Sequence, residues 1–92
     1  GDIQRLFGDP NNYPDSARDA GAQGSVAAAL AIGADGKVTS CNVTQSSGNK
    51  DLDNQTCRIS LSRIRMTPAK DDNGANIASN FTLRVRWQLP QE

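Results

Sequence analysis

The chain has 92 residues, enough for one small domain with a thin hydrophobic core. Its ten basic and ten acidic residues cancel, so composition provides no electrostatic case for binding nucleic acid or anionic lipid. No apolar run approaches the about 18 residues that a membrane-spanning helix needs, so direct membrane insertion by this segment is not expected. Because the chain begins like an excised segment, the sequence leaves undecided whether a membrane anchor lies upstream of Gly1.

The first predicted element is a short helix. Residues 8–12 read Gly-Asp-Pro-Asn-Asn, all turn formers, so residues 1–12 are predicted to be a linker or a loosely held lead-in. Pro14 suits the first helical position because its missing N–H is not needed there. Gly21 suits the position just after the helix, which favours a left-handed backbone. The predicted helix, 14–20, is too short to be stable alone and must be held by packing.

Two strands joined by a hairpin are predicted next. Apolar residues alternate with small ones over residues 24–32, which indicates a strand with one apolar face. An Asp-Gly pair within residues 33–37 marks the hairpin turn. In the return strand, 38–47, the apolar residues are separated by three and then by two positions. This change of step predicts a β-bulge near Thr39–Ser40.

A second helix is predicted after the hairpin. Asn49 or Asp51 is expected to cap its start, and Pro68 is expected to end it. Spacings of four and three define its apolar stripe, which consists of Leu52, Cys57, Leu61 and Ile64, with Thr56 and Ser60 alongside. The helix and the residues after it also carry a run of basic side chains without an acid: Arg58, Arg63, Arg65 and Lys70. We expect these to form a solvated face, with a docking patch as the alternative.

The last predicted element is a long strand. It follows a polar loop at 69–76 with a turn at Asn73–Gly74. Apolar and polar residues alternate over residues 77–89, which predicts up to thirteen residues of strand in an antiparallel sheet with one wet face. The predicted fold class is α+β, with the order α-β-β-α-β. A three-stranded antiparallel sheet would carry two helices packed on one face.

The residue inventory argues against catalysis. The chain has no histidine to act as a base beside a serine or a thiol. Two cysteines are too few ligands for an ordinary structural zinc site. The glycine-containing segment 33–37 opens no helix that would bind phosphate. We therefore expect a chain that is not an enzyme and that has no cofactor and no metal site.

The two cysteines leave three interpretations open. The predicted bulge turns Cys41 to the sheet face that the second helix covers, and Cys57 lies on the stripe of that helix, so a disulfide is favoured. Closing a loop of about 16 residues would stabilise the domain by roughly 3 kcal/mol and would imply an oxidising compartment. Two buried free thiols are the first alternative, and a reactive redox pair is the second.

A sheet of three strands has two edges, and an edge strand exposes unpaired backbone N–H and C=O groups. Such an edge can accept an extended peptide as an additional strand, or it can pair with a second copy of the chain to form a homodimer. Arg84 and Arg86, on the polar face of the last strand, discourage indiscriminate pairing. The competing interpretation is an edge strand that binds no partner and that these charges simply protect from pairing.

Four segments of the chain occur in the order and spacing of one known family. They are YPDSARDAGAQGSV (13–26), IGADGKVTSCNVTQSSG (32–48), the stretch from LDNQTC to DNG (52–74) and FTLRVRWQL (81–89). Together they span about residues 12–89 and resemble the periplasmic C-terminal domain of TonB-type energy transducers, in a subgroup with a cysteine pair. The chain departs from the family pattern at Met66, where an aromatic is common, and at Asn12, where many members have glutamine.

The resemblance implies a binding module. A TonB C-terminal domain at residues 13–92 would lie in the periplasm of a Gram-negative bacterium, in a parent protein anchored in the inner membrane and driven by an ExbB–ExbD-type complex. It would bind the TonB box of an outer-membrane TonB-dependent receptor by strand addition and transmit energy for substrate uptake. The residues implied in peptide binding are Asn12, Tyr13, Ala78, Ser79, Asn80, Phe81, Thr82, Leu83, Arg84, Val85 and Arg86.

A second interpretation keeps the fold but changes the role. A TonB-like or TolA-like periplasmic domain would bind other proteins for a scaffold or a sensor without engaging in transport. The sequence upstream of Gly1 discriminates between the two interpretations. A membrane helix followed by a proline-rich spacer would support the transducer, whereas a peptidase or sensor module would support the alternative.

Overall fold

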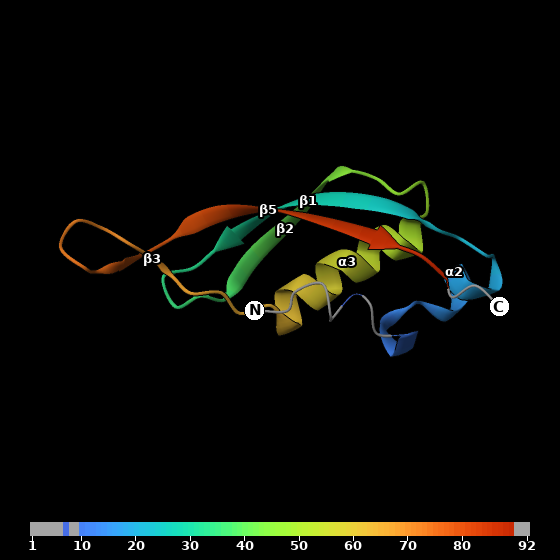
Figure 1. Cartoon of the computed structure of the whole chain (residues 1–92), viewed down its shortest axis with the longest axis horizontal. Helices are drawn as coiled ribbons and strands as arrows, with labels where there is room; N and C mark the ends of the chain where they lie inside the picture. Colours follow the sequence, from blue (N-terminus) through green and yellow to red (C-terminus); the bar gives the residue numbers. More distant parts are fainter. Residues whose placement is uncertain (1–6, 8–9, 90–92) are drawn as a thin grey trace.

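The structure, a computed structural model, describes Phe7 and residues 10–89. A three-stranded antiparallel sheet with the order β2-β1-β5 carries its helices on one face, as Figure 1 shows. This arrangement confirms the predicted α+β class. The elements are η1 (Pro10–Asn12), α2 (Asp15–Asp19), β1 (Gly24–Ile32), β2 (Val38–Gln45), α3 (Lys50–Arg63), β3 (Ala69–Lys70), β4 (Asn76–Ile77) and β5 (Ser79–Trp87).

The short helix α2 ends in a hydrogen-bonded glycine turn. Gly21 has a φ of +67°, and its N–H donates to Arg18 O at 3.0 Å. The N–H of Ala22 donates to Ala17 O at 2.8 Å, so two carbonyls at the helix end are satisfied. Pro14 is extended and lies just before the helix rather than in its first position, so α2 is shorter than predicted.

β1 and β2 form the predicted hairpin, with two bulges. The register shifts at Thr39, which confirms the bulge predicted near Thr39–Ser40. A second shift makes Thr44 an additional residue, which the apolar spacing does not predict. The Thr39 hydroxyl donates to Ala31 O at 3.2 Å. The Thr44 hydroxyl donates to Ala27 O at 3.2 Å, so both bulges are bonded to β1 through side chains.

α3 begins at a capping asparagine and ends before Pro68. The side-chain oxygen of Asn49 accepts from Leu52 N–H at 3.0 Å, so the cap is Asn49 and not Asp51. The backbone is already extended at Ile64. The helix therefore ends without help from the proline, contrary to the prediction.

The buried face of α3 differs from the predicted stripe at one position. The Leu61 side chain is 44% exposed, whereas Ile59, which the prediction omitted, is buried. At about 100° per residue, Leu61 is half a turn around the helix from Leu52 and points away from the sheet. The buried residues of the helix are Leu52, Thr56, Ile59 and Ser60.

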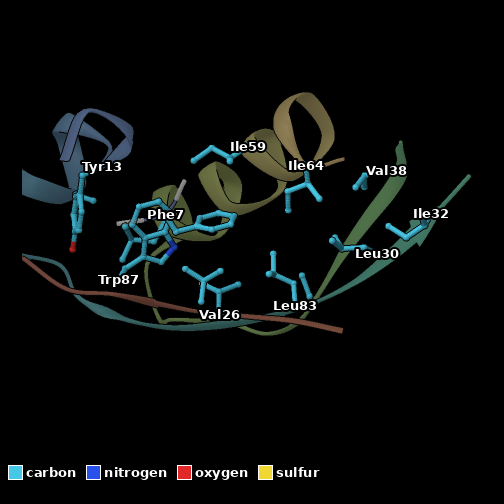
Figure 2. Close-up of a cluster of buried hydrophobic side chains, with 14 residues drawn as sticks. Phe7, Tyr13, Val26, Leu30, Ile32, Val38, Ile59, Ile64, Leu83 and Trp87 are labelled. Atoms are coloured by element: carbon cyan, nitrogen blue, oxygen red, sulfur yellow. The ribbon is translucent and has the colours of Figure 1, made fainter. Parts of the chain in front are cut away.

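The hydrophobic core lies between the inner face of the sheet and α3. In Figure 2, Ile64, just after the helix, points toward Leu83 of the sheet, and Ile59 and Val26 lie on either side of the Phe7 ring in this view. Burial alternates along β1 and β5, in agreement with the alternation of apolar residues in the sequence. The buried hydrophobic residues are Phe7, Tyr13, Ala17, Val26, Ala28, Leu30, Ile32, Val38, Leu52, Ile59, Ile64, Leu83, Val85 and Trp87.

The strand predicted at 77–89 is divided in two. Its main part is β5, and Ile77 belongs instead to β4. β4 pairs with β3 in a small hairpin that stands away from the body of the molecule (Figure 1). Ile77 is 41% exposed, because the helices cover the three-stranded sheet and not this hairpin. Alternation thus predicts an extended backbone but not what the backbone packs against.

Candidate functional site

β5 forms one edge of the sheet along its whole length. It pairs with β1 without a register shift, from Gly24↔Trp87 to Ile32↔Ser79. Within the described residues, β1 is the one strand hydrogen-bonded to it. The other side of β5 is therefore open to a further strand.

The pairing pattern identifies the backbone groups at this open edge. Gly33 N–H donates to Lys37 O at 2.8 Å. The carbonyls of Ala27 and Ala31 accept from threonines of β2, so the odd-numbered residues of β1 face β2. The even-numbered residues of β1 face β5, and their partners there are odd-numbered. The backbone groups of the even-numbered residues of β5, such as Thr82, accordingly point away from β1.

The side chains of β5 divide between the two faces of the sheet. Those in the core are Leu83, Val85 and Trp87. Those on the outer face are exposed, and they are Asn80, Thr82, Arg84 and Arg86. Of the residues predicted to bind a peptide, those from 79 to 86 lie in this one edge strand, and Ala78 lies just before it.

Tyr13 is fixed at the Trp87 end of β5. Its ring meets Trp87 edge-on, with centroids 5.3 Å apart, and its hydroxyl donates to Ala22 O. Phe7 also meets Trp87 edge-on, at 5.7 Å, and Figure 2 shows the three rings together. Burial raises the pKa of the Tyr13 phenol above its ordinary value, against the opposing effect of the Arg18 charge. Tyr13 is thus a core residue beside the edge strand.

Asn12 is buried next to Tyr13 and is bonded to α3. Its backbone carbonyl accepts from Gln55 Nε2 at 2.8 Å, and its Oδ1 accepts from Arg63 Nη1 at 3.3 Å. These contacts join residues 43 and 51 positions apart in the chain. No local sequence pattern indicates them, so Gln55 and Arg63 were absent from the predicted site. Arg63 therefore has a structural contact in addition to its place on the predicted basic face.

The other edge of the sheet, β2, is less suited to accepting a strand. Its two bulges interrupt the regular row of backbone groups. A disulfide also joins Cys41 of β2 to Cys57 of α3, with Cα atoms 5.5 Å apart. This bond confirms the favoured interpretation of the two cysteines. Of the two edges, β5 is therefore the regular one, and β2 is bulged and cross-linked.

Among Phe7 and residues 10–89, no three His, Cys, Asp or Glu side chains gather as a metal site. No helix within those residues is both long enough and apolar enough to cross a membrane.

Comparison with known proteins agrees with this geometry. The family model described as the C-terminal of the Gram-negative bacterial TonB protein matches residues 9–89. The solution structure of the Helicobacter pylori TonB C-terminal domain has the same fold, with a TM-score of 0.65 and 21% identity over 98% of this chain and 79% of that one. A search of curated proteins found no match. Because the family model covers most of the chain, the chain belongs to the family of TonB C-terminal domains.

Proposed function

We propose that the open edge of β5 binds the TonB box of an outer-membrane TonB-dependent receptor as a fourth strand of the sheet. The observation that carries the proposal is the contrast between the two edges. β5 pairs without a bulge over its whole length, whereas β2 is bulged and cross-linked. A guest strand needs a regular row of N–H and C=O groups, which the outward-facing backbone of β5 supplies.

Strand addition suits a domain that must hold several receptors under load. Backbone hydrogen bonds are the same for every peptide sequence, so they tolerate variation among receptors. They lie perpendicular to the strands, so a pull along the guest strand loads them together rather than one at a time. In this arrangement Asn12 and Tyr13 flank the guest at the Trp87 end of β5.

Family membership supports a wider role. We propose that the chain is the periplasmic C-terminal domain of an energy transducer anchored in the inner membrane. An ExbB–ExbD-type complex would drive it, and the domain would transmit that energy to the receptor for substrate uptake. The disulfide supports a periplasmic location, because such bonds persist in oxidising compartments.

Proline substitution tests the strand edge directly. Thr82→Pro removes an N–H that points away from β1, so the pairing with β1 is retained while the open edge loses a donor. Val43→Pro is the matched control, because Val43 lies opposite the even-numbered Ala28 and its N–H points away from β1 at the other edge. We expect Thr82→Pro to abolish binding of a synthetic TonB-box peptide and Val43→Pro to leave the affinity unchanged.

The binding site is read out by amide chemical shifts of the isotope-labelled 92-residue chain during titration. Shifts are expected along residues 79–87 and around residues 12–13. A peptide N-methylated at alternate residues provides a second measurement that does not depend on the folding of the proline variant. One methylation pattern should block binding and the complementary pattern should not. Equal binding of both peptides, or shifts along β2 instead of β5, would overturn the proposal.

A further inference from the structure

We infer that the guest strand carries a pair of acidic side chains, two positions apart, on the face that it turns away from the core, beside Arg84 and Arg86. This inference rests on the proposed function, because it assumes a strand added at the open edge of β5. It specifies the chemistry that the edge selects. Backbone pairing alone does not discriminate between peptides, so selection has to come from side chains.

The strands of the sheet carry positive charge and no negative charge. The three strands β1, β2 and β5 contain no Asp or Glu, and their charged residues are Arg84 and Arg86. The chain as a whole is neutral, so its acidic residues lie in the helices, turns and terminal segments instead. A strand that joins the sheet beside β5 therefore meets positive charge alone among the strand residues.

The geometry of a strand pair brings guest side chains within reach of both arginines. Arg84 and Arg86 are exposed on the same outer face, because side chains alternate along a strand. Their partners on β1 are Ala27 and Ser25, which are small and uncharged. On the open side, a directly opposite guest residue has its Cβ about 5 Å away, within reach of a carboxylate. Two guest carboxylates two positions apart therefore match the two arginines.

The two arginines also bear on the register of the guest strand. The outer face of β5 is charged at its Trp87 end and neutral at its other end, where Asn80 and Thr82 lie. A strand edge with no side-chain preference allows a guest to slip by two residues and still pair. An acidic pair opposite Arg84 and Arg86 removes this degeneracy, because slipping by two leaves one carboxylate opposite Thr82 or beyond the strand end. The arginines would thus set both the preference and the position of the guest.

Three synthetic peptides test the inference. Each has nine residues with valine at alternate positions, and two adjacent positions of the outward set carry Asp, Asn or Lys in the three versions, with Thr at the rest. We expect the Asp peptide to bind about three- to tenfold more tightly than the Asn peptide at low salt, the size of two exposed cross-strand ion pairs. The Lys peptide should bind most weakly, and the preference should diminish at high salt.

The variants assign the preference to the two arginines. Arg84→Gln with Arg86→Gln should remove the preference for Asp over Asn. Lys50→Gln with Arg58→Gln is the matched control, because it removes the same charge from exposed positions of α3, away from the open edge. Arg84→Glu with Arg86→Glu should invert the order, so that the Lys peptide binds most tightly.

The outcomes separate this inference from the proposed function. If all three peptides shift the amides of β5 with equal affinity, or if the preference survives in the Arg84→Gln, Arg86→Gln variant, the inference is wrong while strand addition stands. If no peptide shifts those amides, and the TonB-box peptide fails as well, strand addition itself is wrong. A preference that follows the arginines through neutralisation and inversion supports the inference.

Discussion

The indole N–H of Trp87 is buried in the core and bonded to a hydroxyl. It donates to Thr56 Oγ1 at 2.9 Å, and that hydroxyl donates in turn to Leu52 O at 2.8 Å. Thr56 and Leu52 are fully buried, and Trp87 is 1% exposed, so water cannot replace these bonds. The side chain of Thr56 therefore joins α3 to the end of β5 through a polar contact inside an apolar core.

Thr56→Val is expected to destabilise the chain although it conserves the shape of the side chain. The variant leaves the Trp87 N–H buried without an acceptor, which costs about 1–3 kcal/mol. Urea unfolding followed by far-ultraviolet circular dichroism measures the change. Ser62→Ala is the control, because the Ser62 hydroxyl donates to Arg58 O at 2.7 Å on an exposed part of the same helix. Equal losses in the two variants would contradict the argument from burial.

Asp53, in the first turn of α3, is hydrogen-bonded to the loop before the helix. Its carboxylate accepts from Ser46 Oγ, from Ser47 N–H at 2.9 Å and from Ser47 Oγ at 2.8 Å. Burial acts to raise the pKa of Asp53, but the hydrogen bonds from the two serines outweigh it, and the pKa is lowered. The ionised form is therefore the one that the folded state prefers.

This preference makes part of the stability pH-dependent. Because the pKa of Asp53 is lower in the folded chain, its contribution is complete above the unfolded value of about 4 and is lost as the pH falls through the folded value. Asp53→Asn should therefore lower the free energy of unfolding by about 1 kcal/mol at pH 7 and by less at about pH 3. Urea unfolding at both pH values measures the difference. A gap between parent and variant that is constant with pH would contradict the assignment.

The hairpin between β1 and β2 is hydrogen-bonded to the segment after α3 at one glycine. Gly36 is buried with a φ of +87°, and its carbonyl accepts from Met66 N–H at 2.8 Å. A Cβ at this position would lie 2.1 Å from Met66 O. The turn and the segment after α3 therefore pack backbone against backbone, which leaves no space for a side chain.

Gly36→Ala is expected to destabilise the chain more than Gly48→Ala. Gly48 also has a positive φ, of +91°, but nothing lies within 4 Å of a Cβ there, so alanine costs the left-handed strain of about 1–2 kcal/mol alone. At Gly36 the segment at Met66 must also move, which adds at least about 1 kcal/mol for the lost hydrogen bond. Thermal unfolding of the two variants measures the difference, and similar melting temperatures would contradict the close approach.

Element order, the hairpin and one bulge were predictable because each leaves a local pattern. The bulge at Thr39 is visible as a change in the apolar step, whereas the bulge at Thr44 falls among exposed residues and leaves no such mark. The buried face of α3 was predicted with Leu61 instead of Ile59. Both residues lie at helical spacing from other apolar residues, and packing alone decides which of them is buried. The alternation of apolar and polar residues placed Ile77 in the last strand, because alternation indicates an extended backbone but not which strand that backbone pairs with.

The strand that forms the candidate site was predictable from the sequence, but the residues that surround this strand were not. Residues 79–86 share one strand because alternation is a local property of the sequence. Which strand is central and which is an edge depends on pairing over long distances, which the alternation does not encode. The contacts of Asn12 with Gln55 and Arg63 are equally non-local, so the fixed position of the residues before α2 came only from the structure.

The disulfide and the open edge of β5 lie at opposite edges of the sheet. The order β2-β1-β5 places β1 between the cross-linked strand and the proposed binding strand. The described part of the chain is elongated, with extents of 52 × 22 × 16 Å. The disulfide therefore lies apart from the proposed peptide-binding edge.

Removing the disulfide should weaken the fold without weakening the proposed binding. Cys41→Ala with Cys57→Ala is expected to lower the free energy of unfolding by about 3 kcal/mol, because the cross-link closes a loop of 16 residues in the unfolded chain. Urea unfolding measures this loss. The affinity for a TonB-box peptide, measured where the variant is folded, should stay the same. A large loss of affinity would show that β2 and α3 contribute to the binding strand.

The edge-on contact between the chain's one tryptophan and one tyrosine has a practical consequence for spectroscopy. Both rings are immobilised in an asymmetric setting at one end of β5, and such rings produce a circular dichroism signal in the near ultraviolet. Loss of that signal while the helical signal persists would mark loosening of the side-chain packing at this end of the sheet. The near-ultraviolet signal therefore indicates whether unfolding begins at this end of the sheet.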